Sequence, residues 1–181
     1  MIQQSAAQAG VLPPLILEQA HDTAAVDALI DHAFGPGRYV KAAERLREHN
    51  RPLLDISHVA FCGGELVGCV RMWPIRIGEP PAVLLGPFAV APDWRSRGLG
   101  AALIERACKA AKAAGHGLVL LVGDAPYFEP LGFQVVPPGR VVMPGPVDPA
   151  RVMYMSFGGE ACPAGAVSAD PNADLGAAGA P

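Results

Sequence analysis

Long hydrophobic runs are missing from this 181-residue sequence. The longest apolar stretches, such as Leu118–Val122, are far shorter than the roughly 20 residues that cross a bilayer, so we expect no membrane association. The N-terminal segment lacks a basic stretch followed by an apolar core, and therefore it does not resemble a secretory signal. These absences predict a cytoplasmic protein.

Cysteine is scarce, and basic residues form no run. The four cysteines show no C-x-x-C spacing and no neighbouring histidine cluster, which predicts reduced thiols rather than a metal site or a disulfide. The fourteen Lys and Arg residues lie between Arg38 and Arg151, and fourteen of the seventeen acidic residues lie between Glu18 and Asp148, so the part of the chain before the tail is close to neutral. Without a basic face, a nucleic-acid partner is not expected. The net charge of −3 comes from the C-terminal tail.

Large apolar residues are rare at the C-terminal end of the chain. Residues 158–181 consist mainly of Ala, Gly, Pro and Asp, a composition that buries too little surface to offset the entropy of ordering. Residues 1–12 are also expected to be disordered. We therefore expect disorder in both segments and a single folded domain over residues 13–157.

Between these ends, hydrophobic periodicity alternates between strand and helix patterns, which predicts an α/β fold with a mixed sheet. A Gly-Gly pair at 63–64 predicts a tight hairpin between two strands. The expected strands are 15–18, 56–62, 66–77, 82–91, 118–122, 133–136 and 151–157, and the expected helices are 22–34, 38–48, 99–114 and 124–132. Because a helix links the strands 82–91 and 118–122, these two strands should be parallel neighbours.

The most informative stretch runs from Leu84 to Ala114, where an apolar strand is followed by Arg95-Ser-Arg-Gly-Leu-Gly100 and then by a helix. This order places unpaired backbone N–H groups and the positive end of a helix dipole at one point, which suits phosphate. The two glycines allow close approach and the two arginines add charged donors. Neither the Walker pattern nor the dinucleotide fingerprint fits. We expect a di- or polyphosphate ligand.

The pattern R-x-x-G-x-G after V-A-P-D-W, followed by Y-x-x-x-L-G-F at 127–133, resembles the cofactor motifs of the GCN5-related N-acetyltransferase (GNAT) family. The resemblance covers residues 14–157 and implies the family's fold, a central mixed sheet of about six or seven strands with about four helices. It also implies acetyl-CoA as co-substrate and transfer of acetyl to an amine. The implied cofactor-binding residues are Phe88, Ala89, Val90, Arg95, Ser96, Arg97, Gly98, Leu99, Gly100, Ala101 and Tyr127.

The resemblance also suggests catalytic roles. Tyr127 matches the family tyrosine near the cofactor sulfur, and a phenol with a pKa of about 10 is a suitable acid toward a leaving thiolate. The alternative is a tyrosine whose ring packs on the sheet. Backbone N–H groups near Phe88 and Val90 are expected to polarise the thioester carbonyl. No cysteine is placed to carry an acetyl group, so the amine is expected to attack directly.

A general base is not evident. Many family members carry a Glu on the central strand, whereas Leu85-Gly-Pro-Phe88 contains no ionisable group. Three residues remain as candidates, each with a structural alternative: His58 as a core histidine, Asp124 as a helix cap, and Glu129 as a solvated residue.

The acceptor is not identified by any motif. Trp73, Arg71 and Arg76 could line an acceptor groove, although a packed aromatic ring and paired arginines are the alternatives. The resemblance implies a small-molecule or peptide amine and no metal, and it is compatible with a monomer or a homodimer. Two other functions stay open: a non-catalytic acyl-CoA-binding or sensing module, and a protein that binds a nucleotide at the phosphate loop.

Overall fold

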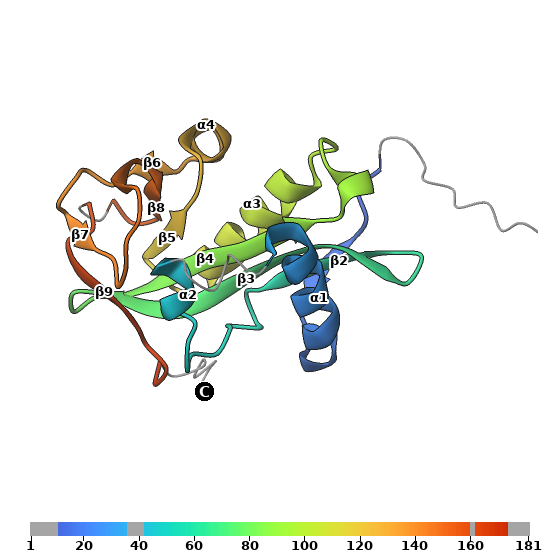
Figure 1. Cartoon of the computed structure of the whole chain (residues 1–181), viewed down its shortest axis with the longest axis horizontal. Coiled ribbons are helices and arrows are strands. Elements are labelled where there is room, and N and C mark those ends of the chain that lie inside the picture. Colours follow the sequence, from blue (N-terminus) through green and yellow to red (C-terminus); the bar gives the residue numbers. More distant parts are fainter. Residues whose placement is uncertain (1–10, 36–41, 160–161, 174–181) are drawn as a thin grey trace, which may run out of the picture.

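A nine-stranded sheet forms the centre of the protein (Figure 1). The computed structural model describes residues 11–35, 42–159 and 162–173. The sheet order is β1-β2-β3-β4-β5-β8-β6, with β9 added to β3 and β7 paired with β9, and this mixed sheet confirms the expected α/β fold. The strands are β1 Leu15–Leu17, β2 His58–Cys62, β3 Glu65–Ile77, β4 Pro81–Val90, β5 Leu118–Val122, β6 Gln134–Val135, β7 Val141–Val142, β8 Val152–Ser156 and β9 Gly165–Ala169.

Helices cover both faces of the sheet (Figure 1). They are α1 Thr23–Phe34, α2 Ala42–Arg45, α3 Leu99–Ala113 and α4 Ala125–Phe128. The apolar stripe of α3 packs on one face, where Leu103 and Met72 are fully buried. On the opposite face α1 packs over β3 and β4 through residues such as Ile30, which belongs to the same buried cluster as Ala89. The long strands β3 and β4 are thus buried between two helical layers.

The hairpin between β2 and β3 forms as predicted. Gly63 and Gly64 have φ angles of +60° and +87°, the left-handed conformations that a tight two-residue turn requires. The helical connection also behaves as expected, because β4 and β5 are parallel and are joined by α3. Their register pairs Val83 with Val119 and Leu84 with Leu120, which fixes the point from which the two strands separate.

The second expected helix is shorter than predicted. Within the described part of the expected range 38–48, only Ala42–Arg45 is helical, and a turn follows; residues 38–41 lie outside the described residues. The Asn50 side chain explains this ending, because its Nδ2 donates to the carbonyls of Leu46 at 3.0 Å and Pro74 at 2.8 Å. These bonds tie the chain after α2 to β3.

The expected disorder of residues 158–181 is wrong for the part that the structure describes. Residues 165–169 form β9, which is antiparallel to β3, with Val167 opposite Ile77. Val167 is buried, and Arg76 forms an ion pair with Asp170 at 3.0 Å. A short strand can therefore dock through backbone hydrogen bonds, one buried side chain and one ion pair. Amino-acid composition does not reveal these interactions. Residues 1–10, 160–161 and 174–181 of the two expected disordered segments lie outside the described residues.

Candidate active site

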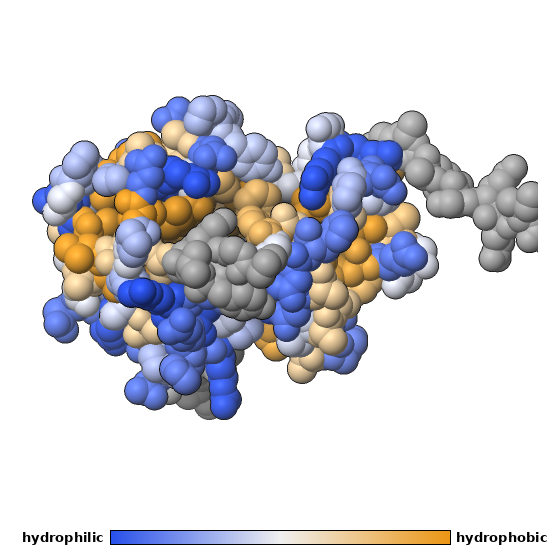
Figure 2. Space-filling view, viewed as in Figure 1, coloured by the Kyte–Doolittle hydropathy of each residue, from blue (hydrophilic) through white to orange (hydrophobic). Residues whose placement is uncertain are grey.

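Separation of β4 from β5 opens a central cleft of about 950 Å³. The two strands pair only at Val83 and Leu84, after which β4 continues beside β3 while β5 stays paired with β8. The cleft is lined from β4 by Phe88 and Val90 and from the β5 side by Val122. On the face shown in Figure 2, hydrophobic residues are exposed on the side of β5 and β8, whereas α1 shows a mixture of hydrophilic and hydrophobic residues.

The strand β4 changes its register where it enters the central cleft. Val70 faces Phe88 but Met72 faces Leu85, so β4 bulges at Gly86 and Pro87. Pro87 has no N–H group, which leaves the N–H groups from Phe88 onward as the nearest donors on this strand. The Ala89 side chain is buried under α1, so this predicted site residue offers the central cleft its backbone rather than its side chain.

The loop before α3 forms an anion-binding nest. Ser96 and Gly98 have φ angles of +59° and +83°, and alternating left-handed residues turn successive N–H groups to one side. The first helical hydrogen bond runs from the Ala102 N–H to the Gly98 carbonyl at 3.0 Å. The N–H groups that precede it, including that of Gly100, have no acceptor within the helix. They are available to a phosphate at the positive end of α3.

The structure brings most of the predicted loop residues to the central cleft, but not all of them. Arg95 lines it and donates from Nε to the Val90 carbonyl at 3.2 Å. Arg97 lies outside the lining, with its guanidinium 5.3 Å from the centre of the Trp94 ring. Leu99 is fully buried in the core, so its side chain cannot contact a ligand. The side chains of these two residues therefore lie away from the central cleft, and a role in cofactor binding would fall to their backbone groups.

Tyr127, on α4, lines the central cleft and packs against β4. Its ring stacks on Phe88 with centroids 5.9 Å apart and planes 12° apart, and the ring of Phe128 lies nearly perpendicular to both rings, 5.0 Å from that of Tyr127. The hydroxyl lies beside Gly100, since a Cβ atom at that glycine would be 2.7 Å from the phenol oxygen. Partial burial raises the pKa of Tyr127, so the phenol keeps its proton at neutral pH. Tyr127 can therefore donate a proton inside the central cleft.

Of the three candidate bases, only Asp124 lines the central cleft. It occupies the N-cap position of α4, but its carboxylate pairs with Arg151 at 3.2 Å instead of capping the helix. His58 is buried, its Nδ1 lies 3.2 Å from the Ile56 carbonyl, and burial lowers its pKa. His58 lines a different hollow, and Glu129 lines none of the clefts described here.

A second cleft of about 760 Å³ adjoins the central cleft at Pro87. Arg71 and Trp73, both suggested by the sequence, line this second cleft, whereas Arg76 does not and instead pairs with Asp170. Its residues come from α1, β3, β4 and the segment from α2 to residue 55: Ala20, Thr23, Asp27, Asp31, Glu44, Arg47, Glu48, Arg51, Pro52, Leu54, Asp55, Arg71, Trp73 and Pro87.

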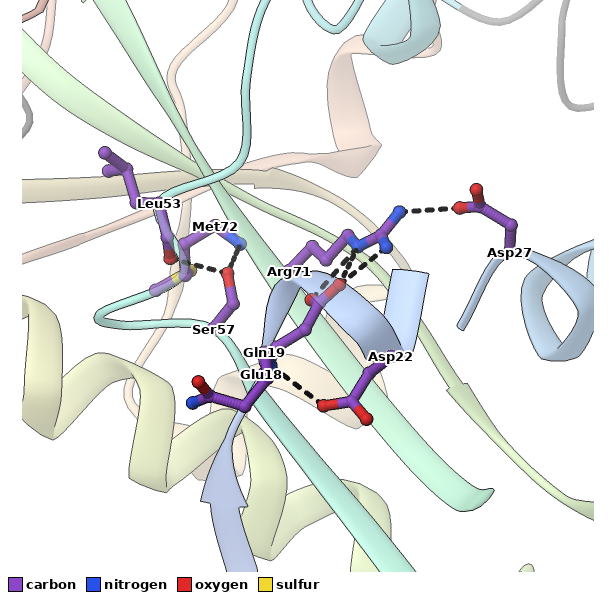
Figure 3. A network of polar contacts seen from close by, with 8 residues as sticks. All are labelled: Glu18, Gln19, Asp22, Asp27, Leu53, Ser57, Arg71 and Met72. Carbon is purple, nitrogen blue, oxygen red and sulfur yellow. Dashed lines mark hydrogen bonds and ion pairs between the residues drawn. The ribbon is translucent and has the colours of Figure 1, made fainter. Parts of the chain in front are cut away.

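Arg71 lies at the base of the second cleft in a network of ion pairs (Figure 3). Its Nε and Nη2 donate to Glu18, with a shortest distance of 2.6 Å, and its Nη1 donates to Asp27 at 2.6 Å. The Glu18 side chain is fully buried. Because a buried guanidinium needs a counter-charge, Glu18 is a functional residue of this network that sequence reasoning missed. Its only sequence signal was an acidic residue at the end of an apolar strand.

Comparison with known proteins identifies the family. The profile described as the Acetyltransferase (GNAT) family matches residues 23–133. The chain belongs to this family. The matched range includes α1, β4, the nest before α3, and Tyr127. Among curated proteins no relative matches the chain.

Solved GNAT structures share this fold. The Escherichia coli N-acetyltransferase YhbS in complex with CoA has a TM-score of 0.70 at 21% identity, covering 88% of this chain and 91% of its own. A GNAT acetyltransferase from Brucella melitensis in complex with acetyl-CoA has a TM-score of 0.65 at 24% identity, with coverage of 87% and 95%. Arabidopsis thaliana Naa50, bound to the bisubstrate analogue CoA-Ac-MVNAL, gives 0.55 at 14% identity, with coverage of 81% and 100%.

The central cleft of this GNAT protein fits acetyl-CoA. The nest at Ser96 and Gly98 supplies donors for a diphosphate, and the gap between β4 and β5 offers backbone groups and apolar walls to a thin chain. Within residues 11–35, 42–159 and 162–173, no group of three or more His, Cys, Asp or Glu residues could hold a metal ion. No helix in the same part of the chain is long and apolar enough to cross a membrane.

Proposed function

We propose that this protein transfers an acetyl group from acetyl-CoA to a primary amine by direct attack of the amine on the thioester. The observation that carries the proposal is the central cleft, where the anion nest, the β4 backbone and the Tyr127 hydroxyl face one space. Family membership supports acetyl transfer as the reaction class. The acceptor would be a small-molecule or peptide amine that enters from the second cleft.

Each group in the central cleft has one task in this proposal. The N–H groups at the start of α3 bind the diphosphate. The backbone N–H groups near Phe88 and Val90 donate to the thioester oxygen as charge develops on it. The carbon–sulfur bond breaks as the carbon–nitrogen bond forms, and Tyr127 gives its proton to the departing thiolate. The proton lost by the amine leaves through water or Asp124, because residues 85–88 offer no base.

Direct attack is also supported by the four cysteines. Burial raises the pKa of Cys69 and that of Cys108 to about 12, so neither forms a thiolate near neutral pH. Cys62 and Cys162 are partly exposed but line neither cleft. No cysteine is therefore placed to carry the acetyl group.

Calorimetric titration with acetyl-CoA tests the proposal. Gly98→Glu places a side chain and a negative charge in the nest, and we expect it to abolish saturable binding. Gly64→Glu is the matched control, because its φ of +87° is close to the +83° of Gly98 and a new Cβ atom would meet nothing at either position. Both variants carry the same backbone strain, but only Gly98 lies in the central cleft.

Wild-type protein that is folded but does not bind acetyl-CoA would refute the proposal and leave a nucleotide as the candidate for the phosphate loop. Equal binding by Gly98→Glu and Gly64→Glu would place the cofactor elsewhere.

A non-catalytic acyl-CoA-binding or sensing module is the second candidate. The observation that favours it is the absence of an ionisable side chain in Leu85–Phe88, at the centre of the cleft. Such a module would bind acetyl-CoA in the same way but would not release CoA in the presence of amines.

A further inference from the structure

The second cleft lies beside the place where acetyl transfer is proposed to occur. Pro87 lines both clefts and directly precedes Phe88, whose N–H group is assigned to the thioester oxygen. A molecule bound in the second cleft is therefore separated from the reacting carbonyl by one residue of β4. The side chains of this cleft should then decide which amines are accepted.

Acidic side chains outnumber basic ones around the second cleft. Its lining contains five carboxylates and three arginines. Two of these arginines already have acidic partners: Arg71 binds the buried Glu18, and Arg47 forms an ion pair with Glu44 at 2.5 Å. Because the remainder of the folded part is close to neutral, this excess of negative charge is local. Such a site attracts cations.

Asp27 is held in place as a carboxylate of this cleft (Figure 3). Its Oδ1 accepts a hydrogen bond from Arg71 Nη1 at 2.6 Å, yet its side chain remains 48% exposed. Glu18 neutralises the same guanidinium from the interior through Nε and Nη2. The negative charge of Asp27 is thus not needed to balance Arg71, and the carboxylate is oriented before any ligand arrives.

Trp73 independently indicates that a ligand belongs in the second cleft. Its side chain lines the cleft and is 8% exposed, and its Nε1–H group is buried without a hydrogen-bond partner among the described residues. Leaving a buried N–H group unpaired costs free energy. A bound molecule with an oxygen acceptor would remove this cost. A site that offers both the Asp27 carboxylate and the unpaired Trp73 N–H group suits a molecule that combines positive charge with a carbonyl or hydroxyl oxygen.

We propose that the acceptor is an amine that carries a second, cationic group and an oxygen acceptor, and that Asp27 binds this second cation in the second cleft. The inference rests on the proposed acetyl transfer. The attacking amine must be neutral, so the positive charge recognised by Asp27 belongs to a different group of the same molecule. Glu18 acts as a positioning residue, because it holds Arg71, which in turn orients Asp27.

Binding of two amides that differ by one charge tests this proposal. L-lysinamide and L-norleucinamide share the α-amine and the carbonyl oxygen, and only the first carries a side-chain ammonium group. Each is titrated by calorimetry into full-length protein saturated with CoA, which prevents turnover. We expect wild-type protein to prefer L-lysinamide roughly fivefold, the size expected for a half-exposed ion pair. In Asp27→Asn the preference should fall toward one.

Two further variants control this measurement. Glu65→Gln removes an exposed carboxylate at the start of β3, outside both clefts, and should keep the preference. Asp55→Asn removes an exposed carboxylate of the second cleft that does not contact Arg71, and should weaken the preference even if Asp27→Asn proves unstable. Thermal unfolding of each variant checks that it is folded.

The outcomes separate this inference from the proposed function. If wild-type protein does not bind CoA, the proposed function is wrong and the inference falls with it. If CoA binds but the protein does not distinguish the two amides, binds neither, or keeps its preference in a folded Asp27→Asn, the inference is overturned and acetyl transfer stands.

Discussion

Tyr127 is the residue on which the catalytic proposal depends most. Its hydroxyl reaches Gly100, and burial raises its pKa, so it remains a proton donor across the neutral range. We predict that Tyr127→Phe lowers kcat by about 100-fold, a typical loss for a general acid, while acetyl-CoA affinity changes little because the ring still stacks on Phe88. Steady-state release of CoA measures the first quantity and calorimetry the second.

The control for this prediction is Tyr154→Phe, because Tyr154 is a tyrosine on β8 that lines neither cleft. A Tyr127→Phe enzyme as fast as wild type would remove Tyr127 from the acid role. Wild-type protein that binds acetyl-CoA but acetylates no amine would instead favour the sensing module.

At the scale of single residues, the sequence predicted backbone positions better than side-chain directions. Gly98 and Gly100 lie where the motif placed them, because a turn before a helix is a local structure. Leu99 is turned into the core and Arg97 is drawn onto Trp94. Both outcomes depend on neighbours that a linear motif does not contain.

Among the elements, β9 offers the clearest test of a structural finding that composition did not predict. Val167 packs in the core, whereas the side chain of Ser168 is exposed. We predict that Val167→Asp lowers the free energy of unfolding by about 2 kcal/mol, because a buried valine is replaced by a charge. Ser168→Asp, the neighbouring control, should change it by less than about 0.5 kcal/mol.

Urea denaturation measures the free energy of unfolding of both variants. Hydrogen exchange at the backbone of Ile75–Ile77 reports whether these residues have lost β9 as a pairing partner. Unchanged exchange in Val167→Asp would show that β9 does not protect this edge of the sheet. β9 can pair with β3 because β2 pairs with β3 only up to Val70, which leaves the backbone of β3 beyond Val70 available on that edge. This opening depends on the lengths of other strands.

For the whole molecule, buried histidines make stability depend on pH. Burial lowers the pKa of His58 and of His116 below 6.5. The unfolded chain therefore takes up protons before the folded chain does, so stability is full above about pH 6.5 and is lost as the pH falls below it. We predict that His58→Asn makes this dependence shallower, whereas replacing the exposed His32 by Asn leaves it unchanged.

Urea unfolding at a series of pH values from 5 to 8 measures this slope. An unchanged slope in His58→Asn would show that His58 is as accessible to protons in the folded protein as in the unfolded chain.

The sequence by itself determined the features that depend on short segments: the hairpin at Gly63-Gly64, the crossover through α3, and the anion nest at its start. Each follows from local backbone preferences and hydrophobic periodicity. The tertiary structure alone decided what distant segments build together. It brought Tyr127 over Gly100, separated β4 from β5, and set Arg71 between Glu18 and Asp27. These arrangements depend on packing and charge neutralisation between residues far apart in the chain, which no local pattern encodes.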